Sequence, residues 1–297
     1  MEQMGQNMLL NMVIRPPRSE YPDDTHENDK VLTLQSGKKV VKKVFKIDNP
    51  SGQKLCCQMY EPIPEERPNA QMPCFIYMHG NAGNKNEADA YLSLLIERGI
   101  NLFSFDFSGC GNSEGEWVTL GWKEQKDLES VINYLNGLGT VSKIGLWGRS
   151  MGAGTSLMYM ASNNEKISFV ILDSAFSSFP LIVNHLASQM MGGLPPQFVD
   201  MLMVGVGVQV AQKTGGMKIQ DLKPIEFAPK CTVPAMFIHG IDDDFVTMSH
   251  TEEVYNAYGG ETKDVQYVPG EHNSERPLET LEYAANYAKK YLLSSQE

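Results

Sequence analysis

Short apolar segments alternate with stretches of helical periodicity along most of this 297-residue chain. Six segments have the length and composition of buried strands: residues 74–78, 101–105, 143–147, 168–172, 234–238 and 265–268. Helices are predicted between them and near the C-terminus, over residues 86–98, 122–135, 153–161 and 278–292. This alternation predicts an α/β fold with a mostly parallel central sheet and helices on both of its faces.

The first part of the chain differs from this pattern. Residues 40–47 and 54–60 predict two antiparallel strands that open a single domain at residues 31–297. An N-terminal arm, residues 1–30, precedes that domain. Within it, residues 1–14 predict a short amphipathic helix that either packs on the body or contacts a membrane or a partner. A secretory signal is not expected, because this segment lacks a basic start and a cleavage site.

A glycine-rich turn follows the strand predicted at residues 143–147. Gly148-Arg149-Ser150-Met151-Gly152 has the G-x-S-x-G pattern between a strand and a helix, which is the setting of a nucleophile elbow. The turn is so sharp that its flanking positions require glycine. We therefore predict that Ser150 projects its hydroxyl above the sheet as a nucleophile.

Three further turns supply the groups that such a serine needs. His79-Gly80-Asn81 follows an early strand, so the backbone amides of Asn81 and Met151 are the predicted oxyanion-hole donors. Residues 242–244 are three aspartates after another strand, and Asp173 also follows a strand. His272 comes after the last strand. The chain order serine, aspartate, histidine predicts a catalytic triad, and each of these aspartates is a candidate acid.

These motifs resemble those of the α/β-hydrolase superfamily. The sequence is similar to the serine aminopeptidase S33-like branch, which also contains acyl-protein thioesterases of the α/β-hydrolase type. Besides the turns already named, residues 105–113 (FDFSGCGNS) carry the likeness. The acid of that branch stands in an H-G-x-x-D pattern, which here selects Asp243. The resemblance implies a serine hydrolase with the triad Ser150, Asp243 and His272.

Residues 177–229 occupy a place where the plain fold needs one short crossover, so we predict an insertion there. In the superfamily that the chain resembles, an insertion at this position forms a cap over the active site. Its segment 201–208 is apolar on every side, and methionine adapts to varied apolar shapes. Met201, Met203 and Val206 are therefore expected to line a pocket for an apolar, lipid-like acyl group.

The predicted reaction is hydrolysis of a carboxylic ester or thioester through an acyl-enzyme. Two alternatives stay open. An S33-type aminopeptidase would need an acidic group for the substrate ammonium, and Asp200, Asp221 and Glu226 are candidates. A non-catalytic interaction protein could keep the same fold, although a scaffold has no physical need for a strained elbow.

The composition limits the kinds of partner that the protein is expected to bind. A formal net charge of −11 argues against nucleic acid and against purely electrostatic attachment to anionic lipid. Five cysteines without framework spacing indicate reduced thiols and a cytoplasmic setting, with membrane association left open through residues 1–14. Since no Cys/His cluster has metal-ligand spacing, we expect no metal, and we expect no cofactor.

Overall fold

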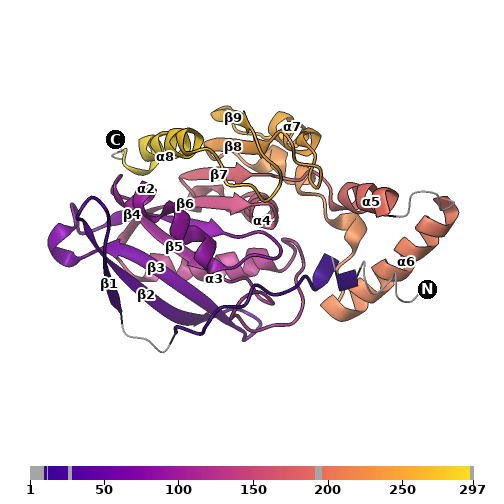
Figure 1. The fold of residues 1–297 in the computed structure, drawn as a ribbon, viewed down its shortest axis with the longest axis horizontal. Coiled ribbons are helices and arrows are strands. Elements are labelled where there is room, and N and C mark those ends of the chain that lie inside the picture. The colour runs from indigo at the N-terminus through magenta and orange to yellow at the C-terminus, as the bar shows by residue number, and fades with distance from the viewer. Residues whose placement is uncertain (1–9, 12, 26–28, 191–195, 295–297) are drawn as a thin grey trace.

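The computed structural model describes residues 10, 11, 13–25, 29–190 and 196–294, with side chains for all of these except 187–190 and 196–203. Through this part of the chain runs a sheet with the strand order β1-β2-β3-β5-β4-β6-β7-β8-β9 (Figure 1). Its strands are β1 (Lys30–Thr33), β2 (Lys39–Asp48), β3 (Lys54–Pro62), β4 (Met72–Met78), β5 (Asn101–Phe105), β6 (Val141–Arg149), β7 (Phe169–Asp173), β8 (Ala235–Gly240) and β9 (Lys263–Val268).

The sheet is antiparallel at its beginning and parallel elsewhere. β1, β2, β3 and β5 pair antiparallel in succession, whereas β5, β4, β6, β7, β8 and β9 pair parallel. Every residue of β4, β5, β7 and β8 is buried, as expected for strands that are covered on both faces. The predicted α/β-hydrolase sheet is thus confirmed. β1 was not predicted, because its four residues include only two apolar ones.

Two apolar cores, one on each face, hold the helices to the sheet. One core includes residues of α3 (Glu124–Gly137), α4 (Met151–Met160) and α7 (Met248–Ala257). The other includes residues of α2 (Leu92–Ile96) and α8 (Leu278–Leu292). Figure 1 shows α8 and α2 on the opposite side of the strands from α3.

The helix predicted at residues 86–98 is divided in two. A 3-10 helix, η2 (Lys85–Tyr91), precedes α2. Lys85 is fully buried, and its backbone amide donates to Asp106 at 2.7 Å. The first turns are therefore fixed by tertiary hydrogen bonds that sequence periodicity does not reveal.

Between β7 and β8 lie α5 (Phe179–Met190) and α6 (Pro196–Thr214), followed by three short 3-10 helices: η4 (Ile219–Asp221), η5 (Pro224–Glu226) and η6 (Ala228–Lys230). α5 and α6 extend from one end of the molecule, near the first described residues of the arm (Figure 1). None of the described helices is long and apolar enough to cross a membrane. The domain boundaries proposed from the sequence remain predictions.

The N-terminal arm lies against the body over its described length. Leu10, Val13 and Ile14 are at most 4% exposed, and the Val118 amide donates to the Ile14 carbonyl at 3.0 Å. Further along, Arg18 donates to the Ser113 carbonyl at 3.3 Å. These contacts agree with the packed alternative for residues 10–14. Residues 1–9 and 12 lie outside the described chain, so a membrane or partner contact there remains a prediction.

Candidate active site

Ser150 stands between the end of β6 and the first residue of α4. Its backbone angles are φ 52° and ψ −109°, a strained combination for a side chain other than glycine. A Cβ atom at Gly148 would lie 2.3 Å from the Gly152 carbonyl oxygen, and one at Gly152 would lie 2.3 Å from that of Met78. Both glycines of the predicted elbow are therefore sterically required.

His272 joins Ser150 to Asp243. Its Nε2 lies 3.0 Å from Ser150 Oγ, and its Nδ1 lies 2.6 Å from Asp243 Oδ2. A carboxylate accepts hydrogen bonds only, so Nδ1 carries the proton and Nε2 is left to accept from the serine hydroxyl. The structure thus brings together all three residues of the predicted triad, in the tautomer that a general base needs.

Asp243 is held in its ionised form. Burial opposes ionisation, but the hydrogen bond and charge of His272, together with the Val246 amide, outweigh it and lower the pKa of this carboxyl. The amides of Phe245 and Val246 donate to Asp243 Oδ1 at 3.0 and 2.8 Å. Nearby, burial lowers the pKa of His239, which favours its neutral form. Asp243 Oδ2 thus lies 2.6 Å from His272 Nδ1 and 3.6 Å from His239 Nε2, so its short hydrogen bond is to His272.

The other candidate acids are placed elsewhere. Asp242 is exposed and accepts from the Gly270 amide at 3.0 Å, and Asp244 is also exposed. Asp173 is fully buried and pairs with Arg276 at 2.8 Å, while its backbone carbonyl accepts from the Ser150 amide at 2.8 Å. Asp173 therefore supports the elbow from below.

The turn at residues 79–81 is braced by the His79 ring. His79 is fully buried, with Nδ1 2.6 Å from the Gly80 carbonyl oxygen, and its Nε2 accepts from the Phe107 amide at 3.2 Å. These contacts give His79 a structural role in the turn. Asn81 and Met151 both line the cavity at Ser150. Met151 begins α4, so its amide belongs to the first turn, where helical N–H groups have no partner within the helix.

Arg149 supports the histidine loop. Its Nη2 donates to the backbone carbonyls of His272 and Ser274, at 2.8 and 3.0 Å. An arginine beside Ser150 could form a salt bridge to the body or meet a substrate carboxylate. The structure instead shows contacts to carbonyl oxygens, which fix the loop that presents His272.

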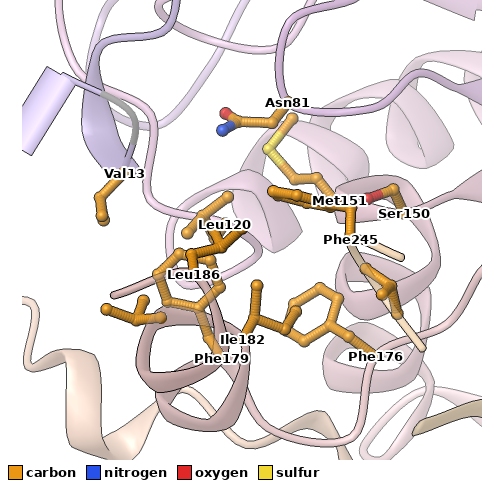
Figure 2. Close-up of a pocket in the computed structure, with 12 residues that line it drawn as sticks. Val13, Asn81, Leu120, Ser150, Met151, Phe176, Phe179, Ile182, Leu186 and Phe245 are labelled. Carbon is orange, nitrogen blue, oxygen red and sulfur yellow. The ribbon is translucent and has the colours of Figure 1, made fainter. Parts of the chain in front are cut away.

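A narrow apolar slot opens beside Ser150 (Figure 2). Its volume is about 50 Å³. The side chains that line it are almost all apolar: Val13, Asn81, Leu120, Ser150, Met151, Phe176, Phe179, Ile182, Val183, Leu186, Phe245 and Val246. Four of them belong to α5, so the predicted insertion does contribute to the wall.

Of the three residues that we expected from the insertion, the structure places Val206 outside the slot. Val206 is fully buried in the main core and is not among the slot residues, because α6 turns Val206 and Val210 inward and leaves Val204 and Val208 exposed. The side chains of Met201 and Met203 lie outside the described residues. Helix α5, together with Val13 of the arm, occupies the place that we assigned to α6.

A second, wider cavity lies on the histidine side of Ser150. Its volume is about 670 Å³. Mainly polar residues line it: Gly80, Asn81, Ala82, Gly83, Glu87, Arg149, Ser150, Asp244, Phe245, Glu271, His272 and Asn273. Ser150 thus borders two cavities of different size and chemistry.

Other polar groups of the sequence have structural contacts. Asp106 accepts from the amides of Lys85 and Asn112, at 2.7 and 2.9 Å, and so shapes the loop after β5. His250 lies 2.7 Å from the Ser177 hydroxyl. All five cysteines are buried with free thiols. Among the described residues, no group of three or more His, Cys, Asp or Glu side chains is arranged to hold a metal ion.

Two family models match this chain, each over just over half of its length. The X-Pro dipeptidyl-peptidase (S15 family) model matches residues 30–197. The model of the C-terminal part of BAAT / acyl-CoA thioester hydrolases matches residues 128–277. Both overlap the segment that contains the elbow.

Individual proteins also resemble this chain in sequence or in fold. The uncharacterized protein YqkD of Bacillus subtilis is 28% identical over 205 residues, 68% of this chain and 64% of its own length. A putative monoglyceride lipase of Schizosaccharomyces pombe is 26% identical over 70% of this chain and 64% of its own. The chain therefore spans somewhat less than two thirds of these relatives. Esterase Pf2001 of Pyrococcus furiosus shares the fold, with a TM-score of 0.67 and 19% identity over 93% of this chain and 97% of its own.

Proposed function

We propose that this chain, which belongs to the α/β-hydrolase superfamily, cleaves carboxylic esters or thioesters with Ser150 as nucleophile. The superfamily is shown by the matches to the S15 peptidase model and to the acyl-CoA thioester hydrolase model. The observation that carries this proposal is the continuous relay from Asp243 through His272 to the Ser150 hydroxyl. Esterases among the fold neighbours and the acyl-CoA thioester hydrolase match support the reaction class.

The relay gives each proton a defined path. Ser150 Oγ attacks the substrate carbonyl while His272 Nε2 takes its proton, and Asp243 stabilises the imidazolium that forms. The Asn81 and Met151 amides would bind the oxyanion, and loss of one such donor raises the barrier by about 3 kcal/mol. His272 then returns the proton to the leaving group. Water hydrolyses the acyl-enzyme by the same steps, with His272 again as the base.

The apolar slot would hold the acyl chain. A water-sized group needs roughly 10–15 Å³ of cavity volume. A slot of about 50 Å³ therefore accepts on the order of four methylene-sized groups. The match to a putative monoglyceride lipase supports an apolar acyl group. We expect catalytic efficiency to rise from acetate through butyrate and then to level off. The slot proposed here is that of α5 and Val13, and a contribution from Met201 and Met203 remains a prediction.

Peptide hydrolysis is a second candidate, favoured by the S15 match. The substrate of an aminopeptidase carries its free ammonium on the acyl side of the scissile bond, which is the side that we assign to the apolar slot. Among the described residues that line that slot there is no carboxylate, and burying an unpaired ammonium there would be costly. Asp221 and Glu226 line neither cavity, and the Asp200 side chain lies outside the described residues. The slot therefore favours ester or thioester over peptide.

Covalent labelling tests the proposal. A fluorophosphonate should label the protein and stop hydrolysis of p-nitrophenyl butyrate, while Ser150→Ala should abolish both labelling and turnover. The variant should melt at nearly the wild-type temperature, because alanine is smaller and relieves strain at the elbow. Ser130→Ala, at a half-buried serine on α3, is the matched control. Turnover retained in Ser150→Ala would refute the assigned nucleophile.

A further inference from the structure

We infer that Ser150 separates an acyl compartment from a leaving-group compartment, and that the second compartment selects cationic or neutral leaving groups over polyanionic ones such as coenzyme A. The inference rests on the proposed function. It assigns the apolar slot and the wide polar cavity to opposite ends of the substrate.

The position of His272 decides which cavity holds which end. The leaving group takes its proton from His272 Nε2, so it needs to lie within hydrogen-bonding reach of that atom when the bond breaks. His272 lines the wide cavity together with Ser150, whereas the slot includes Ser150 without His272. The leaving group is therefore assigned to the wide cavity, and the acyl chain extends in the other direction along α5.

The two compartments also differ in capacity. The slot measures about 50 Å³ and the wide cavity about 670 Å³. A substrate that uses both would combine a short apolar acyl chain with a larger, polar leaving group. Size alone would allow many such groups, coenzyme A among them, so charge is the property that discriminates.

Carboxylates predominate in the leaving-group compartment. Glu87, Asp244 and Glu271 line it. Glu87 is fixed in place, because its Oε2 accepts from the Tyr77 hydroxyl at 3.0 Å. Asp244 and Glu271 are exposed at the mouth. Among the described lining residues the permanent cation is Arg149, and its Nη2 already donates to two loop carbonyls.

The sign of the resulting potential follows from these charges. Three carboxylates against one guanidinium give the compartment a net negative charge, and the whole chain carries −11. Walls of one sign raise the local concentration of oppositely charged ligands and repel ligands of the same sign. A cationic leaving group is therefore attracted toward His272, whereas the phosphates of coenzyme A are repelled. Acyl-coenzyme A thioesters are therefore expected to be poor substrates, although one of the matching family models is that of acyl-CoA thioester hydrolases.

Three thioesters with one acyl group test the inference: butyrylthiocholine, S-butyryl-N-acetylcysteamine and butyryl-coenzyme A. Release of the thiol gives kcat/KM for each. At low ionic strength we expect kcat/KM to be roughly tenfold or more higher for the cationic thioester than for the polyanionic one, with the neutral thioester between them. The gap should narrow in 1 M salt, where the screening length falls to about 3 Å.

Variants locate the effect in the compartment. Glu271→Gln should reduce the ratio of cationic to anionic kcat/KM severalfold, and Glu271→Gln with Asp244→Asn should reduce it further. Glu275→Gln is the matched control, because Glu275 is exposed on the same loop but is not among the cavity residues. It should leave the ratio as it is.

The outcomes separate the inference from the proposed function. If the neutral thioester is hydrolysed and butyryl-coenzyme A reacts as fast or faster at low salt, the charge selection is overturned while the serine hydrolase remains. A ratio that shifts equally in Glu275→Gln would also overturn it, since the effect would then belong to net charge. Absence of hydrolysis for all three thioesters, with no fluorophosphonate labelling, would overturn both.

Discussion

Two regions next to Ser150 are built by different means. One is the carboxyl edge of the sheet, where Ser150, Asp243 and His272 meet, and the other is the apolar cover formed by α5 and Val13. At the edge, polar atoms are fixed by hydrogen bonds of 2.6–3.0 Å: the His272 ring by Ser150 and Asp243, and its loop by Arg149. In the cover, α5 and Val13 contribute aliphatic and aromatic side chains that form a wall.

This difference indicates which property each region controls. Proton transfer needs atoms in hydrogen-bonding reach with the correct tautomer, so a change at the edge should act on rate or on folding. A wall of apolar side chains needs only the correct volume, and the free energy of burial scales with the area removed from water. A change in the cover should therefore act on the range of acyl chains.

The largest expected effect is on the acid of the relay. Asp243→Asn should lower kcat on p-nitrophenyl butyrate by about 10⁴, because an amide favours the wrong tautomer of His272. Asp242→Asn is the matched control on the same loop and should keep most of the activity, since its carboxylate bonds to the Gly270 amide instead. If the two variants lost equal activity, the selection of Asp243 would be wrong.

A second test probes the polar support beneath the elbow. Arg276 and Asp173 are nearly or fully buried, and the guanidinium also donates to Ser174 Oγ at 2.8 Å. Arg276→Met would leave an uncompensated buried carboxylate, which costs about 3–5 kcal/mol of unfolding free energy. Urea titration measures it. Lys126→Met removes an exposed ion pair with Glu129 and should cost less than about 1 kcal/mol. Similar losses in both variants would contradict the structural role of the buried pair.

The contrast between edge and cover also explains what the sequence could predict. The elbow is predictable because the need for glycine at positions 148 and 152 arises from atoms within the turn or directly beneath it. The triad order and most of the sheet follow from local pattern as well. Local pattern did not distinguish among residues 242–244. The family resemblance selected Asp243, and the structure gives the physical reason in the Phe245 and Val246 amides.

The cover was not predictable in the same way. Val13 and Leu120 are more than a hundred residues apart in sequence, yet they line one slot, and Leu120 has a positive φ of 55°. Segment 201–208 of α6 is apolar all round, so its sequence does not specify which face turns inward. Val206 was for that reason assigned to the pocket although it belongs to the core. Phe245 could have been suggested by its place two residues after Asp243.

The smallest expected effect is a shift in acyl preference produced from α5. Ile182 is 2% exposed and lines the slot, whereas its neighbour Leu181 is 50% exposed and does not. Ile182→Ala should lengthen the slot, so that efficiency continues to rise for one or more methylenes beyond the wild-type plateau, by roughly fourfold for each one buried. A series of p-nitrophenyl esters from acetate to octanoate measures it. Leu181→Ala makes a comparable deletion on the outer side of the same helix and should leave the chain-length profile unchanged. If both variants shifted the profile alike, α5 would influence acyl preference through its stability and not through its wall, and the division between an edge that sets rate and a cover that sets range would fail.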